Sequence, residues 1–206
     1  MSASDPYEHR ADRSASPMDI DGSDQPVLAP VIPPPPSDAA HPASPHSGPT
    51  SELQPESASR ILFYRRHEPY FEFTNFAPYT IDWDGHRYPT AEHLFQAQKF
   101  MSIRPDLADR IRNLPNPRAA LEEAGRMRRL QRTDWFDVNL RIMDEILEAK
   151  FTQHPELKHT LLSTDDSELI EDSPVDSFWG CGENGEGQNE LGKALMRLRD
   201  KLKRSD

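Results

Sequence analysis

One stretch of the chain combines a carboxylate, an amide and an amine at helical spacing. Glu92, Gln96 and Lys99 lie within residues 91–101, all of which are compatible with a helix. At about 100° per residue, Glu92 and Lys99 fall within about 20° of each other, and Gln96 lies about 40° further round. A carboxylate can transfer a proton, and an amine can hold an anion or act as a nucleophile. The spacing therefore predicts one polar stripe along an otherwise mainly apolar helix.

This stripe has two interpretations. Because the rest of the helix is mainly apolar, the stripe could form the wall of a pocket. A glutamate and a lysine two turns apart are also common on exposed helices, where such pairs contribute little. The spacing alone fits the exposed helix somewhat better, and the flanking Phe95 and Phe100 favour the pocket wall only modestly.

A second group of residues that can do chemistry follows the strand predicted at 169–172. Glu171, Asp172 and Asp176 stand close in the chain to Trp179. Carboxylates near apolar rings can act as acids, and an indole can stack on a planar base. A capped turn that packs Trp179 into the core explains the same residues equally well.

Glycines are concentrated between residues 180 and 187, before the last predicted helix. Backbone N–H groups there could receive a phosphate, although no βαβ unit surrounds them and the dinucleotide-binding pattern is not matched. Cys181 is the only cysteine, so a cysteine-rich zinc site is excluded, and we interpret it as a small wall residue between two glycines. The scattered histidines match no metal motif. We therefore predict neither a metal nor a cofactor.

The elements that must position these residues are short strands and several helices. A strand is predicted at 61–64, and Asp84-Gly85 predicts a hairpin over 79–88. Prolines and capping residues predict helices over 91–101, 105–114, 117–129, from 135 after Asp134, from 155, and over about 189–203. The helix after Asp134 shows an apolar face typical of an ordinary core, formed by Trp135, Val138, Ile142, Ile146 and Ala149. The sum is a single helix-rich α+β domain over residues 60–206 with a small sheet.

Residues 1–59 have a different composition. They hold 12 of the 20 prolines, one aromatic residue, nine acidic residues and two basic ones. Such a Pro/Ser/Asp-rich segment buries too little apolar surface to offset chain entropy, so we predict a disordered tail. The run from Pro33 to Pro36 could bind a partner weakly, but a spacer is the preferred interpretation because basic anchor residues are missing.

Charge and hydropathy narrow the class of protein further. Of the formal net charge of −11, only −4 belongs to residues 60–206, with no dominant basic cluster, which argues against a dedicated nucleic-acid groove. No run reaches the roughly 18 apolar residues of a membrane span, and no signal peptide is evident. We expect a cytoplasmic protein without membrane association, and a nuclear location stays open.

Several motifs follow one another in a fixed order along the chain. They are Glu72-Phe73-x-Asn75-Phe76, Thr90-Ala91-Glu92-His93-x-Phe95-Gln96-Ala97-Gln98-Lys99-Phe100, Gly125-Arg126, Lys150-Phe151-x-Gln153, Leu169-x-Glu171, Trp179-Gly180 and Asn189-x-Leu191-Gly192. Together they resemble the NADAR (YbiA-like) family of N-glycosidases over about residues 61–204. Thr74 stands where many relatives have serine, and Phe71 stands where the motif often has a smaller residue, which could narrow a pocket.

The resemblance implies hydrolysis of an N-glycosidic bond without a metal. Its substrates are early phosphoribosylamino-pyrimidine intermediates of riboflavin biosynthesis or, alternatively, ADP-ribose attached to guanine. Nucleic acid would be a partner only in the second case. A module that only binds ADP-ribose or NAD is a further alternative, although the presence of Glu92 and Lys99 argues against it.

The resemblance also assigns roles. Glu92 is the leading acid/base or charge-stabilising group, and Asp172 is the second carboxylate candidate. Lys99 either holds a phosphate or ribose hydroxyl as a cation, or attacks the anomeric carbon in a Schiff-base route, which we slightly favour. The predicted substrate-binding residues are Asn75, Phe76, Gln96, Arg126, Trp179, Gly180 and Asn189.

Within that set the expected contacts differ. Asn75 and Asn189 would hydrogen-bond the ribose or base, although turn or cap roles are the alternative. Phe76 and Trp179 would pack against the base. Three arginines are candidate phosphate partners, namely Arg65, Arg66 and Arg126.

Overall fold

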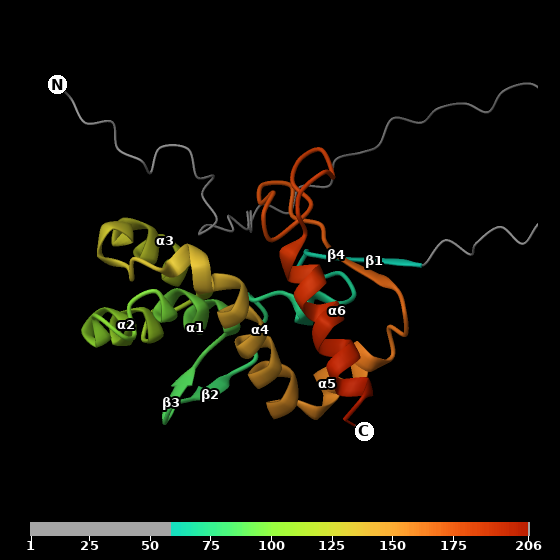
Figure 1. Ribbon diagram of the computed structural model, residues 1–206, viewed down its shortest axis with the longest axis horizontal. Helices are drawn as coiled ribbons and strands as arrows, with labels where there is room; N and C mark the ends of the chain where they lie inside the picture. Colours follow the sequence, from blue (N-terminus) through green and yellow to red (C-terminus); the bar gives the residue numbers. More distant parts are fainter. Residues whose placement is uncertain (1–58, 206) are drawn as a thin grey trace, which may run out of the picture. The chain divides into compact units, whose positions relative to one another are not determined.

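The computed structural model describes residues 59–205 (Figure 1), so all of the predicted tail except Ser59 lies outside the described residues. Within the described residues, three short strands precede five consecutive α-helices, and a fourth strand precedes the last helix, so the prediction of a helix-rich α+β domain is confirmed. The strands are β1 (Arg60–Phe63), β2 (Ile81–Trp83), β3 (His86–Tyr88) and β4 (Glu168–Glu171). The helices are α1 (Ala91–Gln98), α2 (Pro105–Arg112), α3 (Pro117–Arg126), α4 (Trp135–Gln153), α5 (Pro155–Leu162) and α6 (Glu190–Lys203), with 3-10 turns η1 (Phe71–Phe73) and η2 (Arg128–Leu130).

The described strands form two separate pairs, where one small sheet was predicted. β1 and β4 pair in parallel, with Phe63 opposite Glu171. β2 and β3 form the predicted hairpin, in which Asp84 and Gly85 adopt φ values of 48° and 75°. Positive φ at both turn positions suits an Asp-Gly two-residue hairpin. The parallel pair joins segments that are more than 100 residues apart, so β1 holds the end of β4 in place.

Helix starts follow the predicted caps. The Thr90 hydroxyl accepts a hydrogen bond from the His93 N–H at 3.3 Å, and Asn116 Oδ1 accepts one from the Ala119 N–H at 2.8 Å. Asp134 does precede α4, but its carboxylate pairs with Arg132 at 2.6 and 2.8 Å and caps no N–H group. α3 ends at Arg126, before the expected 129, and the chain continues as the tighter turn η2.

α1 lies at the centre of the helical packing. It contacts α2, α3 and α4, whereas α6 packs against α4, α5 and β4 (Figure 1). Because neighbours surround α1, all eight of its residues are buried. The interpretation of its polar stripe as an exposed face is therefore wrong, and the stripe points into the protein.

The inner face of α4 differs from the ordinary apolar face predicted for it. Val138 and Ala149 are only partly buried, whereas Asn139 and Lys150 are fully inside. Lys150 Nζ donates to the carbonyl oxygens of Glu72 and Thr74 at 2.6 and 2.8 Å. α4 thus contributes polar groups to the interior. No helix among residues 59–205 is long and apolar enough to cross a membrane.

Candidate active site

Glu92 is a carboxylate in the protein interior, with 2% of its surface exposed. Its Oε1 accepts a hydrogen bond from Gln96 Nε2 at 2.7 Å, and its N–H donates to the Asn75 carbonyl at 3.0 Å. Burial raises the pKa of Glu92 to about 7, against the opposing effects of the Gln96 hydrogen bond and the Lys99 charge, while Asp176 raises it further. The side chain can therefore give up or accept a proton near neutral pH.

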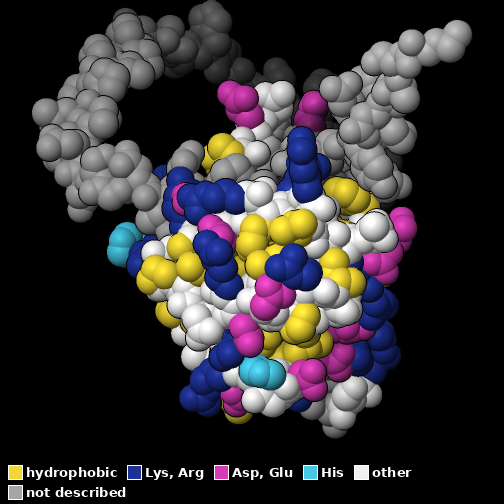
Figure 2. Space-filling view, turned by 90° about the vertical axis from the view of Figure 1, so that its left-hand side faces the viewer, with side chains coloured by type: hydrophobic (Ala, Val, Ile, Leu, Met, Phe, Trp, Pro, Cys, Tyr) yellow, Lys and Arg dark blue, Asp and Glu magenta, His cyan; other side chains and the backbone are white. Residues whose placement is uncertain are grey.

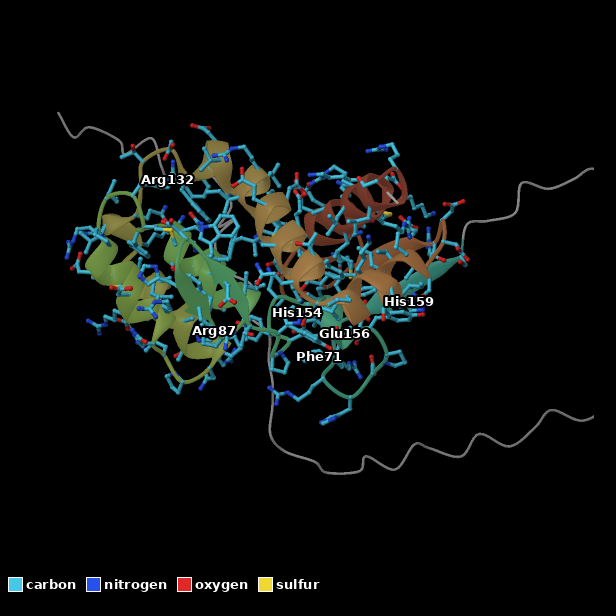
Figure 3. The ribbon with its side chains drawn as sticks, turned by 90° about the horizontal axis from the view of Figure 1, so that it is seen from below. Phe71, Arg87, Arg132, His154, Glu156 and His159 are labelled. Carbon is cyan, nitrogen blue, oxygen red and sulfur yellow. The ribbon has the colours of Figure 1, made fainter. Side chains whose placement is uncertain are left out.

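Lys99 follows Glu92 by two turns and is equally buried. Its Nζ lies 5.4 Å from the centroid of the Trp135 ring and 5.8 Å from that of Phe95. Both distances permit a cation–π interaction, and the amine also acts electrostatically on Glu92. Arg132, labelled in Figure 3, fixes the backbone here because its N–H donates to the Lys99 carbonyl at 2.8 Å. A carboxylate and an amine thus share one interior site.

Two further acids reach this region from the C-terminal part of the chain. Glu171 ends β4 and Asp176 lies in the following loop, and both are buried. Burial raises the pKa of Glu171 well above its usual value, and Asp176 and Glu92 raise it further. Asp176 Oδ1 accepts hydrogen bonds from the backbone N–H groups of Phe178 and Trp179, both at 2.8 Å. The structure therefore brings two further acidic side chains to Glu92, three in all.

Asp172, the predicted second carboxylate, is exposed. Along β4 the buried residues are Leu169 and Glu171, so the next residue points away from the interior. The Asp172 Oδ1 contacts Cys181 Sγ at 3.4 Å, and its N–H donates to the Phe63 carbonyl. A catalytic role for Asp172 stays a prediction. Two other acids interact electrostatically with Glu92, because Asp176 raises the pKa of Glu92 and Glu92 raises the pKa of Glu171.

Several buried polar atoms at this site have no hydrogen-bond partner among the described residues. A buried polar atom left unpaired costs free energy, so such a group indicates a place where water or a ligand supplies the missing bonds. Both hydrogen-bond acceptors and donors are among these atoms. The amide oxygens Asn75 Oδ1 and Gln96 Oε1 are acceptors, and Trp135 Nε1 and Asn139 Nδ2 are donors. The fifth atom is Glu171 Oε2.

Aromatic rings surround these polar groups. Phe95 packs edge-on against Trp135 at a centroid distance of 5.0 Å and against Trp179 at 5.3 Å. Phe178 contacts Trp179 in the same geometry. Trp179 therefore packs beside α1, which matches the alternative of a tryptophan in the core after a capped turn, and its contact with substrate stays a prediction.

Gly180 and Asn189 position the end of β4. A Cβ atom on Gly180 would lie 2.8 Å from the Glu171 carbonyl oxygen and 3.0 Å from that of Asp176. Asn189 Oδ1 accepts from the Glu171 N–H at 3.0 Å, and its Nδ2 donates to the Leu169 carbonyl at 2.8 Å. Substrate contact by these two residues stays a prediction, and the bonds of Asn189 match its alternative structural role.

Phe76 lies in a different cluster from Trp179. It packs with Leu121, Tyr64 and Phe71, and it borders a pocket of about 420 Å³. This pocket lies between the segment that carries η1, where Figure 3 labels Phe71, and the starts of α1 and α3. Its lining is formed by Arg66, Phe71, Phe76, Pro78, Pro89, Thr90, His93, Pro115, Asn116 and Pro117.

The other predicted phosphate partners are exposed. Arg126 forms ion pairs with Glu122 and Glu123 on α3, and Arg65 pairs with Glu68. On the face shown in Figure 2, basic, acidic and apolar side chains are interspersed. These partners are not Glu92, Glu171 or Asp176, so a phosphate-binding role for Arg126 and Arg65 stays a prediction.

From the second chemical group the sequence analysis selected only Asp172 as a catalytic residue and left out Glu171 and Asp176. It placed Trp135 in the core and did not select Asn139. Strand alternation from Leu169 would have identified Glu171, because residues two apart in a strand share a face. Asn139 falls on the same face of α4 as Trp135, which should have marked it as a polar residue in the core.

No three His, Cys, Asp or Glu side chains within residues 59–205 are arranged to hold a metal ion.

The fold and site define a small α+β protein with an interior acid/base cluster walled by aromatic rings. The family described as the NADAR domain matches residues 62–203. N-glycosidase YbiA of Shigella boydii is 40% identical over 69% of this chain and 88% of that protein. An N-glycosidase of Nostoc punctiforme is 42% identical over 69% of this chain and 92% of its own length. The chain belongs to the NADAR family, as the resemblance predicted.

Two further comparisons extend this result. A riboflavin biosynthesis protein of Vibrio vulnificus is 39% identical over 69% of this chain but only 38% of that protein. The NMR structure of Escherichia coli YbiA is 38% identical, with a TM-score of 0.67 over 72% of this chain and 87% of that chain. The fold is therefore shared with a solved member of the family.

Proposed function

We propose that this protein hydrolyses the N-glycosidic bond of phosphate-bearing ribosides of the phosphoribosylamino-pyrimidine type. The chain is a hydrolase of N-glycosyl bonds, because it is about 40% identical to enzymes named N-glycosidases over most of their length. The substrate is our inference. It is supported by a relative named as a riboflavin biosynthesis protein, in which the matching region is one part of a longer chain.

The observation that carries the proposal is the environment of Glu92. Cleavage of a ribosyl C–N bond requires a proton on the departing nitrogen and builds positive charge at the anomeric carbon. With its pKa raised to about 7, Glu92 is partly protonated at neutral pH and donates that proton. Once ionised, its carboxylate stabilises the positive carbon, together with Asp176.

Lys99 can take part in two ways. As a nucleophile, its neutral Nζ forms a bond to the anomeric carbon while the C–N bond to the base breaks, and the base leaves with the proton from Glu92. The bonded Nζ then returns a proton to the Glu92 carboxylate, which passes it to the ring oxygen as the sugar ring opens to an imine. Water adds to the imine, releasing ribose phosphate and restoring the amine. As a clamp, Lys99 would instead bind a phosphate or hydroxyl as a cation and leave the attack to water.

The aromatic groups suit the planar base. Trp179 stands in the wall beside α1, and Phe76 with Phe71 and Arg66 lines the neighbouring pocket. Aromatic faces bind planar rings, and a guanidinium binds phosphate. We assign the planar base to the aromatic side chains of these two regions and the phosphate to Arg66.

Release of the free base tests the proposal. The purified protein is incubated with a phosphoribosylamino-pyrimidine and, separately, with ADP-ribosylated guanine, and each free base is measured with time. We expect release of the pyrimidine. Release of guanine alone would replace the substrate by ADP-ribosylated nucleobases. Binding of ADP-ribose with release of neither base would instead show a module that binds without catalysis.

A further inference from the structure

We propose that Trp135 and Asn139, on the inner face of α4, contact the substrate and donate hydrogen bonds to its ribose oxygens. The inference rests on the proposed function and names the part of the site that recognises the sugar. Trp135 is fully buried and Asn139 is 1% exposed. Neither Trp135 Nε1 nor Asn139 Nδ2 has a hydrogen-bond partner among residues 59–205.

The inner face of α4 runs along the site from Lys99 to Asn75. At one end, the Trp135 ring lies beside Lys99 Nζ and the Phe95 ring. Asn139 follows one turn later, and Met143 follows after another turn. The Sδ of Met143 lies 3.5 Å from Asn75 Nδ2. Because these positions share one helix face, Asn139 lies between the lysine and Asn75.

Donors and acceptors without partners lie on different elements. The two donors come from α4, where the indole N–H can only donate. Two acceptors, Asn75 Oδ1 and Gln96 Oε1, come from elsewhere in the site, and Glu171 Oε2 accepts or donates according to its protonation. A ribose hydroxyl both donates and accepts, so one sugar can satisfy both sets. On an amino-pyrimidine base, by contrast, each group mainly donates or mainly accepts, so the hydroxyl groups favour the sugar as the partner of α4.

Packing alone does not account for Asn139. Its buried neighbours along α4 are apolar, including Ile142 and Ile146, and leucine has nearly the same shape as asparagine. A buried amide without its partner is unfavourable compared with an apolar group of the same shape. The amide therefore weakens the unliganded protein and becomes useful only when a ligand accepts its hydrogen bond.

The test separates stability from binding. Asn139→Leu should leave the melting temperature unchanged or raise it, while weakening binding of ribose 5-phosphate, measured by calorimetry, about tenfold, the scale of one net hydrogen bond. The KM for the riboside should rise in parallel. Ile146→Val is the matched control, because it lowers the melting temperature but removes no donor and should leave the affinity unchanged.

A second pair of variants covers the indole. Trp135→Phe keeps a ring but removes the N–H donor, and Trp83→Phe makes the same change on β2. Only the first should weaken ribose 5-phosphate binding. Unchanged affinity in both Asn139→Leu and Trp135→Phe would overturn the inference, whatever the melting temperatures. Because binding is measured without turnover, this result is distinct from a failure of the proposed reaction, in which the wild-type protein releases no base.

Discussion

Glu92 is almost fully buried and yet titrates near neutral pH, which is the property a proton donor needs. We expect Glu92→Gln to lower turnover at least about a hundredfold, because the amide keeps the shape but cannot transfer a proton. Steady-state release of the base measures this. Glu145→Gln, a similar change in an ion pair on the surface of α4, should keep wild-type activity. Turnover of Glu92→Gln within a fewfold of wild type would remove Glu92 from the mechanism.

A second prediction for Glu92→Gln concerns how its stability, compared with that of the wild type, depends on pH. The pKa of Glu92 is raised in the folded protein from 4.5 to about 7, so its protonated form is favoured by folding. Its contribution to stability is fully present below about pH 4.5 and is lost as the pH rises through 7. Glu92→Gln should therefore gain stability relative to wild type between pH 5 and 8, by up to about 3 kcal/mol at 1.36 kcal/mol per pKa unit.

Urea unfolding at several pH values measures this difference. The quantity of interest is the free energy of unfolding of Glu92→Gln minus that of the wild type. A difference that stays constant from pH 5 to 8 would contradict a raised pKa for Glu92.

Lys99→Arg separates the two roles proposed for the lysine. Arginine keeps the positive charge but cannot form a Schiff base. If Lys99 is the nucleophile, the variant should be nearly inactive while still binding ribose 5-phosphate. Borohydride should also trap a sugar adduct on wild-type Lys99, located by mass spectrometry. Substantial activity in Lys99→Arg together with no trapped adduct would leave the lysine as an electrostatic clamp.

At the scale of elements, the loop after β4 determines where Glu171 and Asp176 lie. The backbone approaches Gly180 so closely that a Cβ atom would overlap the Glu171 carbonyl and Ser173 Cβ, both at 2.8 Å. Gly180→Ala should therefore lower the melting temperature by several degrees and reduce activity, because the loop must move. Differential scanning calorimetry and base release measure the two effects.

Gly125 provides the matched control for this prediction. It lies within α3, and a Cβ atom there would meet nothing within 4 Å. Gly125→Ala should be neutral or stabilising by up to about 1 kcal/mol, because alanine favours a helix over glycine. Equal melting temperatures for the two alanine variants would show that the close approach at Gly180 has little energetic weight.

For the whole molecule, we expect the catalytic domain to be independent of the N-terminal segment. The composition of residues 1–59 offers little apolar surface for a core, and the family match begins at residue 62. A protein that starts at Gly48 should keep the melting temperature and turnover of the full chain. A fall of several degrees on truncation, seen by thermal unfolding of both proteins, would contradict this expectation.

The sequence by itself determined the elements and the residues of α1. Caps, prolines and the Asp-Gly turn act over about four residues, so Thr90, Asn116 and the 84–85 turn predicted helix starts and a hairpin correctly. The family motifs likewise identified Glu92 and Lys99 as the leading candidates. These signals are local, because each depends on neighbouring residues in the chain.

Only the tertiary structure decided which polar groups meet. Burial of α1 depends on α2, α3 and α4, and the acids near Glu92 come from a segment about 80 residues away. Tertiary contacts also determined that the Asn189 amide bonds the backbone of β4. Packing between distant segments sets the dielectric environment of each charge. For this reason the helical spacing between Glu92 and Lys99 could be read from the sequence, whereas the raised pKa of Glu92 could not.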